Sequence, residues 1–318
     1  MKHHILLPID FSPVSEHQIA YVSNLISDPK TTKVSLYHVI PIPAPVYFDD
    51  IPVHYVQPPV EPFRERLKGL AKRLRSSAPG LEVVPQVVSG SPNMCLRMLM
   101  KNGDYDEIVI GSHGHGALFD LLFGSVAAAV LKHASCPVYV LPSNVAECSD
   151  PATGPVLACI DLTETTTQVL ETAASVAQRL GREVVALYAE PGSKAFHITG
   201  YSDLDAWAEK RLRILERTLE KRCRAATAMT AIPCEAVVRI GPPVATLRNE
   251  IEDINPALVV VGAHRKGVVH DLIIGSVSRT LLKHASVPVL VADIQPVEMV
   301  DQPSTKPIED NVILPTAY

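Results

Sequence analysis

The sequence predicts an α/β protein made of two tandem doubly wound domains, each with a parallel sheet and helices on both faces. Short apolar runs alternate with segments of helical periodicity in each half of the chain, as in βαβ units. A single register of self-similarity links the two halves. The length of 318 residues agrees with two domains of about 150 residues each.

The repeat has a constant offset of 151 positions. Segment 111–138, GSHGHGALFDLLFGSVAAAVLKHASCPV, matches segment 262–289, GAHRKGVVHDLIIGSVSRTLLKHASVPV, at 15 of 28 positions. Asp10 and Asp161 keep the same offset. A period this long indicates duplication of a complete domain and excludes a short-repeat solenoid. We expect domains at 1–143 and 154–293, a linker at 143–155 and a flexible tail at 294–318.

The expected elements follow the same order in both halves. Buried strands are expected at 5–9, 34–40, 82–88, 107–110 and 137–141, and then at 156–160, 183–188, 235–240, 257–261 and 288–291. Helices are expected at 15–25, 62–77, 93–101 and 125–133, with a long helix around 204–219. Segment 41–62 contains seven prolines and is expected to be an irregular loop at the carboxyl end of the sheet, either a solvated connection or a lid.

Composition excludes several classes of protein. The net charge of −5 argues against a strongly basic nucleic-acid binder. No apolar run reaches the 18 or so residues that a membrane span needs, and the short apolar N-terminal stretch is interrupted by Asp10, so we expect a cytoplasmic protein without a membrane partner. The six cysteines contain no C-x-x-C pair and are expected to be free thiols, several of them buried: Cys95, Cys136, Cys148, Cys159, Cys223 and Cys234.

The strongest functional motif is Gly111-x-x-Gly114 followed, after nine residues, by Gly124-Ser125. Glycines at the end of a strand allow the backbone to turn and to approach a ligand closely. Gly124-Ser125 opens the next helix, where unpaired N–H groups and the helix dipole favour an anion. Glycines used only for tight turns are the alternative, but this combination after a strand and before a helix favours phosphate binding.

Asp10 is expected at the carboxyl end of the first strand. A carboxylate there can accept hydrogen bonds from a ribose hydroxyl or a base amine, as the acidic residue of dinucleotide-binding folds does. The alternative is that Asp10 caps the following helix, and the two roles are compatible.

These motifs, with the closing H-A-x-x-P-V strand, resemble the universal stress protein family in its tandem form. The resemblance implies an open five-stranded parallel sheet in the order 3-2-1-4-5 and a site for ATP, with or without Mg²⁺. It implies that Asp10 contacts adenine or ribose, that the Val39 backbone pairs with adenine, and that the glycine motif borders ribose and phosphates. The implied nucleotide-binding residues are Pro8, Ile9, Asp10, Val39, Ile110, Gly111, Ser112, Gly114, Gly124, Ser125 and Val126.

The second half departs from the motif at Arg265, which stands where the first half has Gly114. Its side chain can block the amide turn, and its fixed charge can pair with a phosphate. The second site is therefore either degenerate, which we favour, or it binds an anion differently. Its residues would be Asp161, Gly262, Arg265, Gly275 and Ser276.

Neither a catalytic arrangement nor a metal site can be read from the sequence. The loop lacks the Lys-Ser or Lys-Thr of a Walker motif, and His113 and His115 in a glycine-rich loop favour phosphate or solvent over a metal ion. We therefore expect a nucleotide-binding module for stress signalling with an unknown protein partner. The alternatives are a slow ATPase or nucleotidyl-transferring enzyme, and a structural partner protein that binds no nucleotide.

The fifth strand of each half is short, apolar and, in the implied order, at the edge of its sheet. An open apolar edge invites pairing, and a duplicated domain provides a second such edge in the same chain. The sequence therefore predicts an intramolecular pseudo-dimer in which segments 137–141 and 288–291 meet while both crevices stay open. A homodimer of whole chains is left open.

Overall fold

The first half of the chain forms a five-stranded sheet in the expected order. The computed structural model describes residues 2–42, 47–48, 51–52, 59–112, 124–143, 153–191, 202–265, 272–273, 275–284 and 286–294. The first-half strands run in the order β5-β2-β1-β6-β7, all parallel, which is 3-2-1-4-5 for the five main strands. They and their helices are β1 (His3–Pro8), α1 (Pro13–Leu25), β2 (Thr32–Pro41), α2 (Glu61–Ser77), β5 (Glu82–Gly90), α3 (Pro92–Asn102), β6 (Glu107–Gly111), α4 (Ser125–His133) and β7 (Val138–Leu141).

The proline-rich segment 41–62 contains one regular feature that the sequence did not predict. Two short strands, β3 (Tyr47–Phe48) and β4 (Ile51–Pro52), form an antiparallel pair within it. The expectation of a wholly irregular loop was therefore wrong at these residues. Both strands consist of apolar or aromatic residues and prolines, and they are separated by only two residues, as in a tight hairpin.

The second half repeats the order as β10-β9-β8-β11-β13. Strand β11 continues to residue 265, beyond the expected end at 261, and its last residues pair with the additional strand β12. The elements are β8 (Val156–Ile160), α5 (Thr166–Leu180), β9 (Val184–Glu190), α6 (Ser202–Thr227), β10 (Cys234–Ile240), α7 (Pro243–Ile254), β11 (Leu258–Arg265), β12 (Leu272–Ile273), α8 (Ser276–His284) and β13 (Val289–Ile294).

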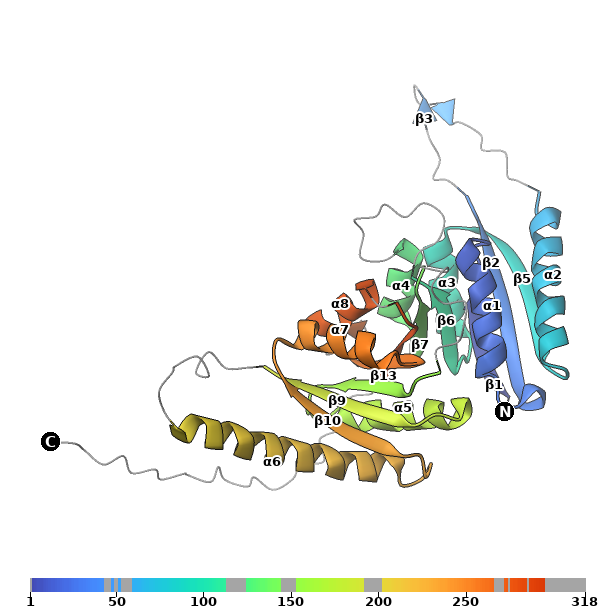
Figure 1. Cartoon of the computed structure of the whole chain (residues 1–318). Helices are drawn as coiled ribbons and strands as arrows, with labels where there is room; N and C mark the ends of the chain where they lie inside the picture. Colours follow the sequence, from blue (N-terminus) through green and yellow to red (C-terminus); the bar gives the residue numbers. More distant parts are fainter. Residues whose placement is uncertain are drawn as a thin grey trace, which may run out of the picture.

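The two halves join into one mixed sheet of ten strands, with β12 attached to β11 (Figure 1). Strands β7 and β13 pair antiparallel, with Val138 opposite Val291 and Val140 opposite Val289. Antiparallel pairing of equivalent strands is what a pseudo-twofold axis between the halves produces. The predicted meeting of the fifth strands is confirmed, and the tandem repeat forms an intramolecular pseudo-dimer.

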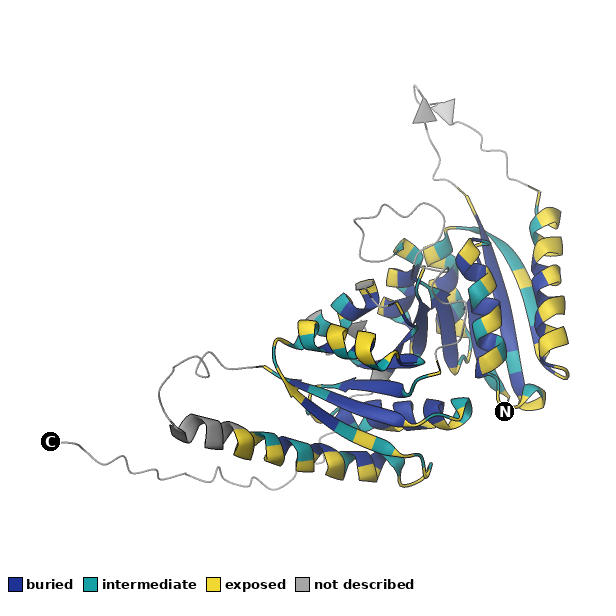
Figure 2. Cartoon of the chain, in the orientation of Figure 1, coloured by how far each residue is buried: buried dark blue, intermediate teal, exposed yellow. Residues whose placement is uncertain are grey.

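Each face of this sheet carries one hydrophobic core that spans both halves. Side chains of α1, α2, α5 and α6 form the core on one face, and those of α3, α4, α7 and α8 form the core on the other. Side chains alternate between the two faces along each strand, so a strand contributes to both cores: Ile5 and Leu7 face the first, and Leu6 faces the second. Figure 2 shows buried strands between helices whose outer faces are exposed, as expected for a parallel sheet covered on both sides.

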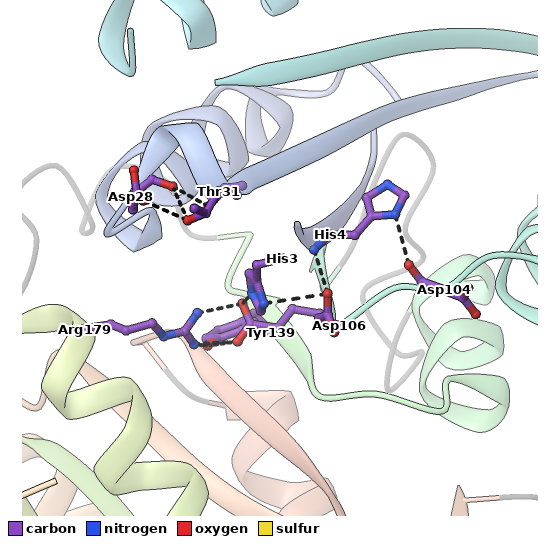
Figure 3. Close-up of polar contacts among 10 residues, drawn as sticks. His3, His4, Asp28, Thr31, Asp104, Asp106, Tyr139 and Arg179 are labelled. Carbon is purple, nitrogen blue, oxygen red and sulfur yellow. Dashed lines mark hydrogen bonds and ion pairs between the residues drawn. The ribbon is translucent and has the colours of Figure 1, made fainter. Parts of the chain in front are cut away.

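A buried polar cluster joins the halves across this seam (Figure 3). Arg179 of α5 donates through Nη1 to Oε2 of Glu107 at 3.1 Å and through Nη2 to the Tyr139 hydroxyl at 2.8 Å. A second bond from Nη2 reaches Glu107 Oε1, and His3 Nε2 lies 3.2 Å from Oε2 of the same carboxylate. Burial alone would raise the pKa of Glu107, but the close contact with His3 and the hydrogen bonds from Arg179 outweigh burial and lower that pKa.

This cluster breaks the pseudo-symmetry of the seam. The residue equivalent to Arg179 in the first half is Asp28, and the residue equivalent to Glu107 in the second half is Leu258. Asp28 accepts a hydrogen bond from Thr31 within its own half (Figure 3), and Leu258 is fully buried. The ion pair therefore links the halves on only one side of the pseudo-twofold axis.

The described cysteines Cys95, Cys136, Cys159, Cys223 and Cys234 are free thiols, and Cys159 and Cys223 are buried, as predicted. Cys148 lies outside the described residues. Within the part of the chain that the structure describes, no helix combines the length and apolar character that a membrane crossing needs.

Candidate functional site

The predicted nucleotide-binding residues of the first half gather where the strand order reverses. Strands β1 and β6 are neighbours, but β2 follows on one side and β7 on the other, so the connections from β1 and β6 leave toward opposite faces. Asp10 follows β1, Val39 lies near the end of β2, and Gly111 ends β6, with Ser112 directly after it. Open α/β sheets bind ligands in the crevice at such a point.

Asp10 is held in a tight turn directly after β1. Its Oδ1 accepts hydrogen bonds from the Ser12 backbone N–H and the Ser15 hydroxyl, both at 2.9 Å. Ser12 is the N-cap of α1, so Asp10 orders the turn before the helix and is not itself the capping residue. The carboxylate is exposed at the mouth of the crevice.

The residue after this aspartate has a strained backbone in both halves. Phe11 has φ 61° and Leu162, its equivalent after Asp161, has φ 57°. The left-handed region is uncommon for bulky residues and costs of order 1–3 kcal/mol. The same strain at equivalent positions indicates that both halves preserve the direction in which the chain leaves the first strand.

His38 anchors the end of β1 from the neighbouring strand. The Ile9 N–H donates to the Tyr37 carbonyl at 2.8 Å, and the Ile9 carbonyl accepts from His38 Nδ1 at 2.7 Å. The ring packs between Phe11 and Phe63, with centroid distances of 4.5 and 5.1 Å. Burial lowers the pKa of His38, so the imidazole is neutral near pH 7 and Nδ1 carries the proton in this contact.

This arrangement determines the direction of the Val39 backbone. In a parallel ladder, the N–H and C=O groups of one residue point to the same neighbouring strand, and alternate residues share that direction. Tyr37 bonds to Ile9 on the β1 side, so the polar groups of Val39 point to the same side, beyond the residue where β1 ends. The Val39 side chain is only 8% exposed. A ligand in the crevice therefore meets the main chain of Val39, whose side chain is in the core.

The predicted phosphate-binding end is built from β6 and α4. The Gly124 N–H donates to the Ser112 carbonyl at 3.0 Å, which joins the two ends of segment 113–123. The helix begins at Ser125 without a side-chain cap, and Ser125 is exposed. The N–H groups of the first turn, from Ser125 to Ala127, have no intrahelical acceptor and point toward the crevice end of the helix.

The remaining predicted residues divide into the crevice floor and those outside the described part. Pro8, Ile9 and Ile110 are buried, and Val126 is half-buried. Gly114, with His113 and His115, lies outside the described residues. In the ranges that are described, no cluster of three or more acidic, histidine or cysteine side chains is placed to hold a metal ion.

The equivalent crevice of the second half differs on the base side. Strand β9 is shifted by one residue relative to the sequence offset of 151, so Ala189 takes the place of Val39 and Glu190 takes the place of Ile40. Its carboxylate accepts from the Tyr188 hydroxyl at 2.5 Å and from Arg211 of α6 at 2.8 and 3.0 Å. Burial and the hydrogen bond to Glu190 raise the pKa of Tyr188 to about 12. Tyr188 takes the place of the anchoring histidine His38. These changes place a tyrosine at the position of the anchoring histidine and a bound carboxylate at the position of the buried Ile40.

The phosphate side of the second crevice differs as well. The Asp161 turn is retained, with Oδ1 accepting from the N–H and hydroxyl of Thr163 at 3.0 and 2.6 Å. Gly262 lies within β11, and Gly275 precedes the helix that starts at Ser276. The main chain at Arg265 is extended and pairs with Leu272 of β12.

A separate groove of about 420 Å³ lies between α3 and α4. Met94 and Arg97 line it from α3, and Lys132 and His133 line it from α4. Its lining includes none of the residues that were predicted to bind the nucleotide, so it is distinct from the crevice at the strand ends.

These features define a tandem α/β protein with a candidate ligand site at the carboxyl ends of the first and fourth strands of its first half. The chain belongs to the universal stress protein family: the family model matches residues 1–142 and 153–293. Universal stress protein Rv2005c of Mycobacterium tuberculosis is 31% identical to this chain over 223 residues, which cover 70% of this chain and 73% of that protein.

One solved structure matches the architecture of nearly the whole chain. A universal stress protein from Archaeoglobus fulgidus superimposes with a TM-score of 0.62 at 20% identity, covering 93% of this chain and 100% of its own. Another structure of an A. fulgidus universal stress protein, solved in complex with dAMP, covers 44% of this chain and 98% of its own at 19% identity, with a TM-score of 0.31.

Proposed function

We propose that the first-half crevice binds ATP or a related adenine nucleotide and that the chain is a nucleotide-binding module for stress signalling. The observation that carries this proposal is the combination at one switch point of an outward-facing main chain at Val39, an ordered carboxylate at Asp10 and an uncapped helix N-terminus at Ser125. Each suits one part of a nucleotide: base, ribose and phosphates.

The base is assigned to Val39 because a main-chain N–H and C=O can pair with the adenine edge as donor and acceptor. Asp10 accepts from a ribose hydroxyl, and Ser12 and Ser15 hold its carboxylate in position. Gly111, Ser112 and Gly114 border the ribose and phosphates in this proposal. Mg²⁺, where present, would be coordinated by the phosphate oxygens, because oxygens are its preferred ligands. A family member has been crystallised with dAMP, which is an adenine nucleotide.

The phosphates are assigned to the start of α4. Gly124, Ser125 and Val126 present the first-turn N–H groups, and the positive end of the helix dipole adds to their attraction for an anion. Gly124 has φ −57° and ψ 145°, which any residue can adopt. A side chain introduced at this position therefore changes the space for the phosphates without straining the backbone.

We further propose that the second crevice is degenerate and that one chain binds one nucleotide. Next to the residue equivalent to Val39, the Glu190 carboxylate is fixed by Tyr188 and Arg211, and its negative charge opposes a ligand that is itself anionic. At the phosphate position, Arg265, whose main chain is extended and pairs with β12, takes the place of Gly114. Asp161, Gly262, Gly275 and Ser276 remain, but the two ends of the site have changed.

Isothermal titration calorimetry with ATP and Mg²⁺ tests both proposals. The wild-type chain should show one site, and Gly124→Val should abolish binding because its branched Cβ occupies the phosphate position. Gly275→Val changes the equivalent residue of the second half and should leave affinity and stoichiometry unchanged. Loss of binding in Gly275→Val, or unchanged binding in a folded Gly124→Val chain, would contradict the assignment. ATP turnover should not exceed about one per minute, far below the typical enzyme range of about 1–10³ per second.

A further inference from the structure

Two cysteine thiols of the second half contact each other beneath the long helix α6. Cys223 lies near the C-terminal end of α6 and is only 2% exposed, and Cys234 begins β10 and is half-buried. The two side chains are hydrogen-bonded to each other, and both thiols are free. Helix α6 packs on β10, so the pair lies at the contact between these two elements.

The contact favours ionisation of one thiol of the pair. The hydrogen bond from Cys234 lowers the pKa of Cys223 although burial opposes that shift. The same contact and burial raise the pKa of Cys234, which remains the donor. A thiolate is the form of cysteine that reacts with oxidants and disulfides, and a neighbouring thiol that can attack the product is the second requirement for a disulfide.

The pair is absent from the first half. Val83 stands where the second half has Cys234, at the start of the third main strand. The corresponding helix α2 buries leucines and an alanine along this face: Leu67, Leu70, Ala71 and Leu74. Apolar side chains are thus sufficient for packing here, and the fold does not require two thiols at this contact.

We propose that Cys223 and Cys234 are an oxidation site that forms an intramolecular disulfide on exposure to a peroxide. One sulfur takes an oxygen from hydrogen peroxide and becomes a sulfenic acid, and the other peroxide oxygen leaves as water. The second thiol then attacks the oxidised sulfur, the S–S bond forms, and the hydroxyl leaves as a second water. Two thiols and one peroxide give one disulfide and two waters.

The bond would fix the end of α6 to the edge strand β10. It would close a short loop, residues 223–234, in which Met229 is 94% exposed and Ala231 has φ 54°. The residue before Cys223 is Arg222, whose Nη1 donates to the Thr163 carbonyl in the turn that follows Asp161. Oxidation therefore acts one residue away from a contact that supports the second crevice.

Peptide mapping of the full chain after diamide treatment tests the proposal. Diamide, an azo compound, accepts the two thiol hydrogens and becomes a hydrazine, and it avoids the oxidation of Met229 that peroxide would cause. Trypsin cuts after Arg222, Arg224 and Arg239, so the expected product is peptide 223–224 joined to peptide 225–239, two hydrogens lighter than the reduced pair. Dithiothreitol should reverse the link, and low concentrations of hydrogen peroxide should form the same link.

Two variants separate this site from the other thiols. Cys234→Ser should lose the linked peptide, and Cys95→Ser, a half-buried cysteine of α3, should form it to the same extent as wild type. The native mass should remain that of one chain, which excludes a link between molecules. The proposal is overturned if Cys223 and Cys234 are recovered as separate alkylated peptides under conditions that oxidise other cysteines, or if the disulfides found join other residues.

Discussion

Removing the Arg179 side chain should weaken the seam between the two halves more than any surface charge does. Arg179→Met keeps the length of the aliphatic stem but removes the guanidinium that bridges Glu107 and Tyr139. The Glu107 side chain is 8% exposed and Arg179 is 21% exposed, so the variant leaves a buried carboxylate without its main counter-charge. Burial then opposes ionisation of Glu107, and only His3 and the Tyr139 hydroxyl, which donates to Oε1 at 3.1 Å, remain to offset it.

The magnitude follows from the cost of breaking a buried ion pair. Removing one partner typically costs 3–5 kcal/mol of unfolding free energy, and the partial exposure of Arg179 places the expected loss near the lower end, at about 3 kcal/mol. Replacing both partners removes the uncompensated charge. Glu107→Leu, which copies Leu258 of the second half, combined with Arg179→Met should therefore unfold within about 1 kcal/mol of wild type.

Urea unfolding followed by far-ultraviolet circular dichroism at pH 7 measures these free energies. Arg213→Met is the matched control, because its pair with Glu209 is exposed on α6 and should contribute less than about 0.5 kcal/mol. The reasoning fails if Arg179→Met costs less than about 1 kcal/mol. It also fails if the double variant loses the sum of the two single losses, because the residues would then not be coupled.

Three further outcomes are expected. Glu107 raises the pKa of His3, so the stabilisation that protonated His3 gives the folded chain is present below about pH 6.5 and is lost as pH rises through the raised pKa. His3→Ala should therefore flatten the fall in Tm between pH 6 and 8, and an unchanged slope would argue against this linkage. Gly181→Ala should lower the free energy of unfolding by about 1 kcal/mol, because Gly181 has φ 64° and no neighbouring atom near its Cβ position. Gly69→Ala, within α2, should raise that free energy by a few tenths to about 1 kcal/mol. Equal effects of the two variants in urea unfolding would contradict the backbone explanation. Val138→Asp with Val291→Asp places two carboxylates opposite each other in the β7–β13 ladder and should separate the halves, so that protease cleaves segment 143–155 more readily. Cleavage at the wild-type rate would contradict the pairing of β7 with β13.

The repeat predicted the features that the two halves share. A constant offset predicted equivalent strands, and the apolar fifth strands predicted their own pairing, because an unpaired apolar edge within a duplicated chain has an equivalent partner. The structure confirms the strand order and the seam. Strand ends were less predictable: β11 continues to Arg265 because it pairs with β12, and a pairing partner so near in the chain has no signature in the periodicity of either segment.

Features that differ between the halves could not be found by the same reasoning. Arg179 and Glu107 have the unrelated equivalents Asp28 and Leu258, so the ion pair across the seam leaves no repeated pattern. The constant offset also misaligns β9 by one residue, so the replacement of His38 by Tyr188 is seen only in the strand register. The positive φ of Phe11 and Leu162 has no sequence signal, because neither is a residue that favours that region.

Native mass spectrometry of the full chain mixed with ATP and Mg²⁺ tests the central claim most directly, because it counts ligands on each molecule. The proposed first-half site has the main chain of Val39, and its glycine motif includes Gly114. In the second half, Glu190 directly follows the residue equivalent to Val39, and Arg265 takes the place of Gly114. We predict a single added nucleotide mass per chain, retained in Gly275→Val and absent from Gly124→Val. Two nucleotides on the wild-type chain would contradict the degenerate second crevice, and none at saturating ATP would contradict nucleotide binding itself.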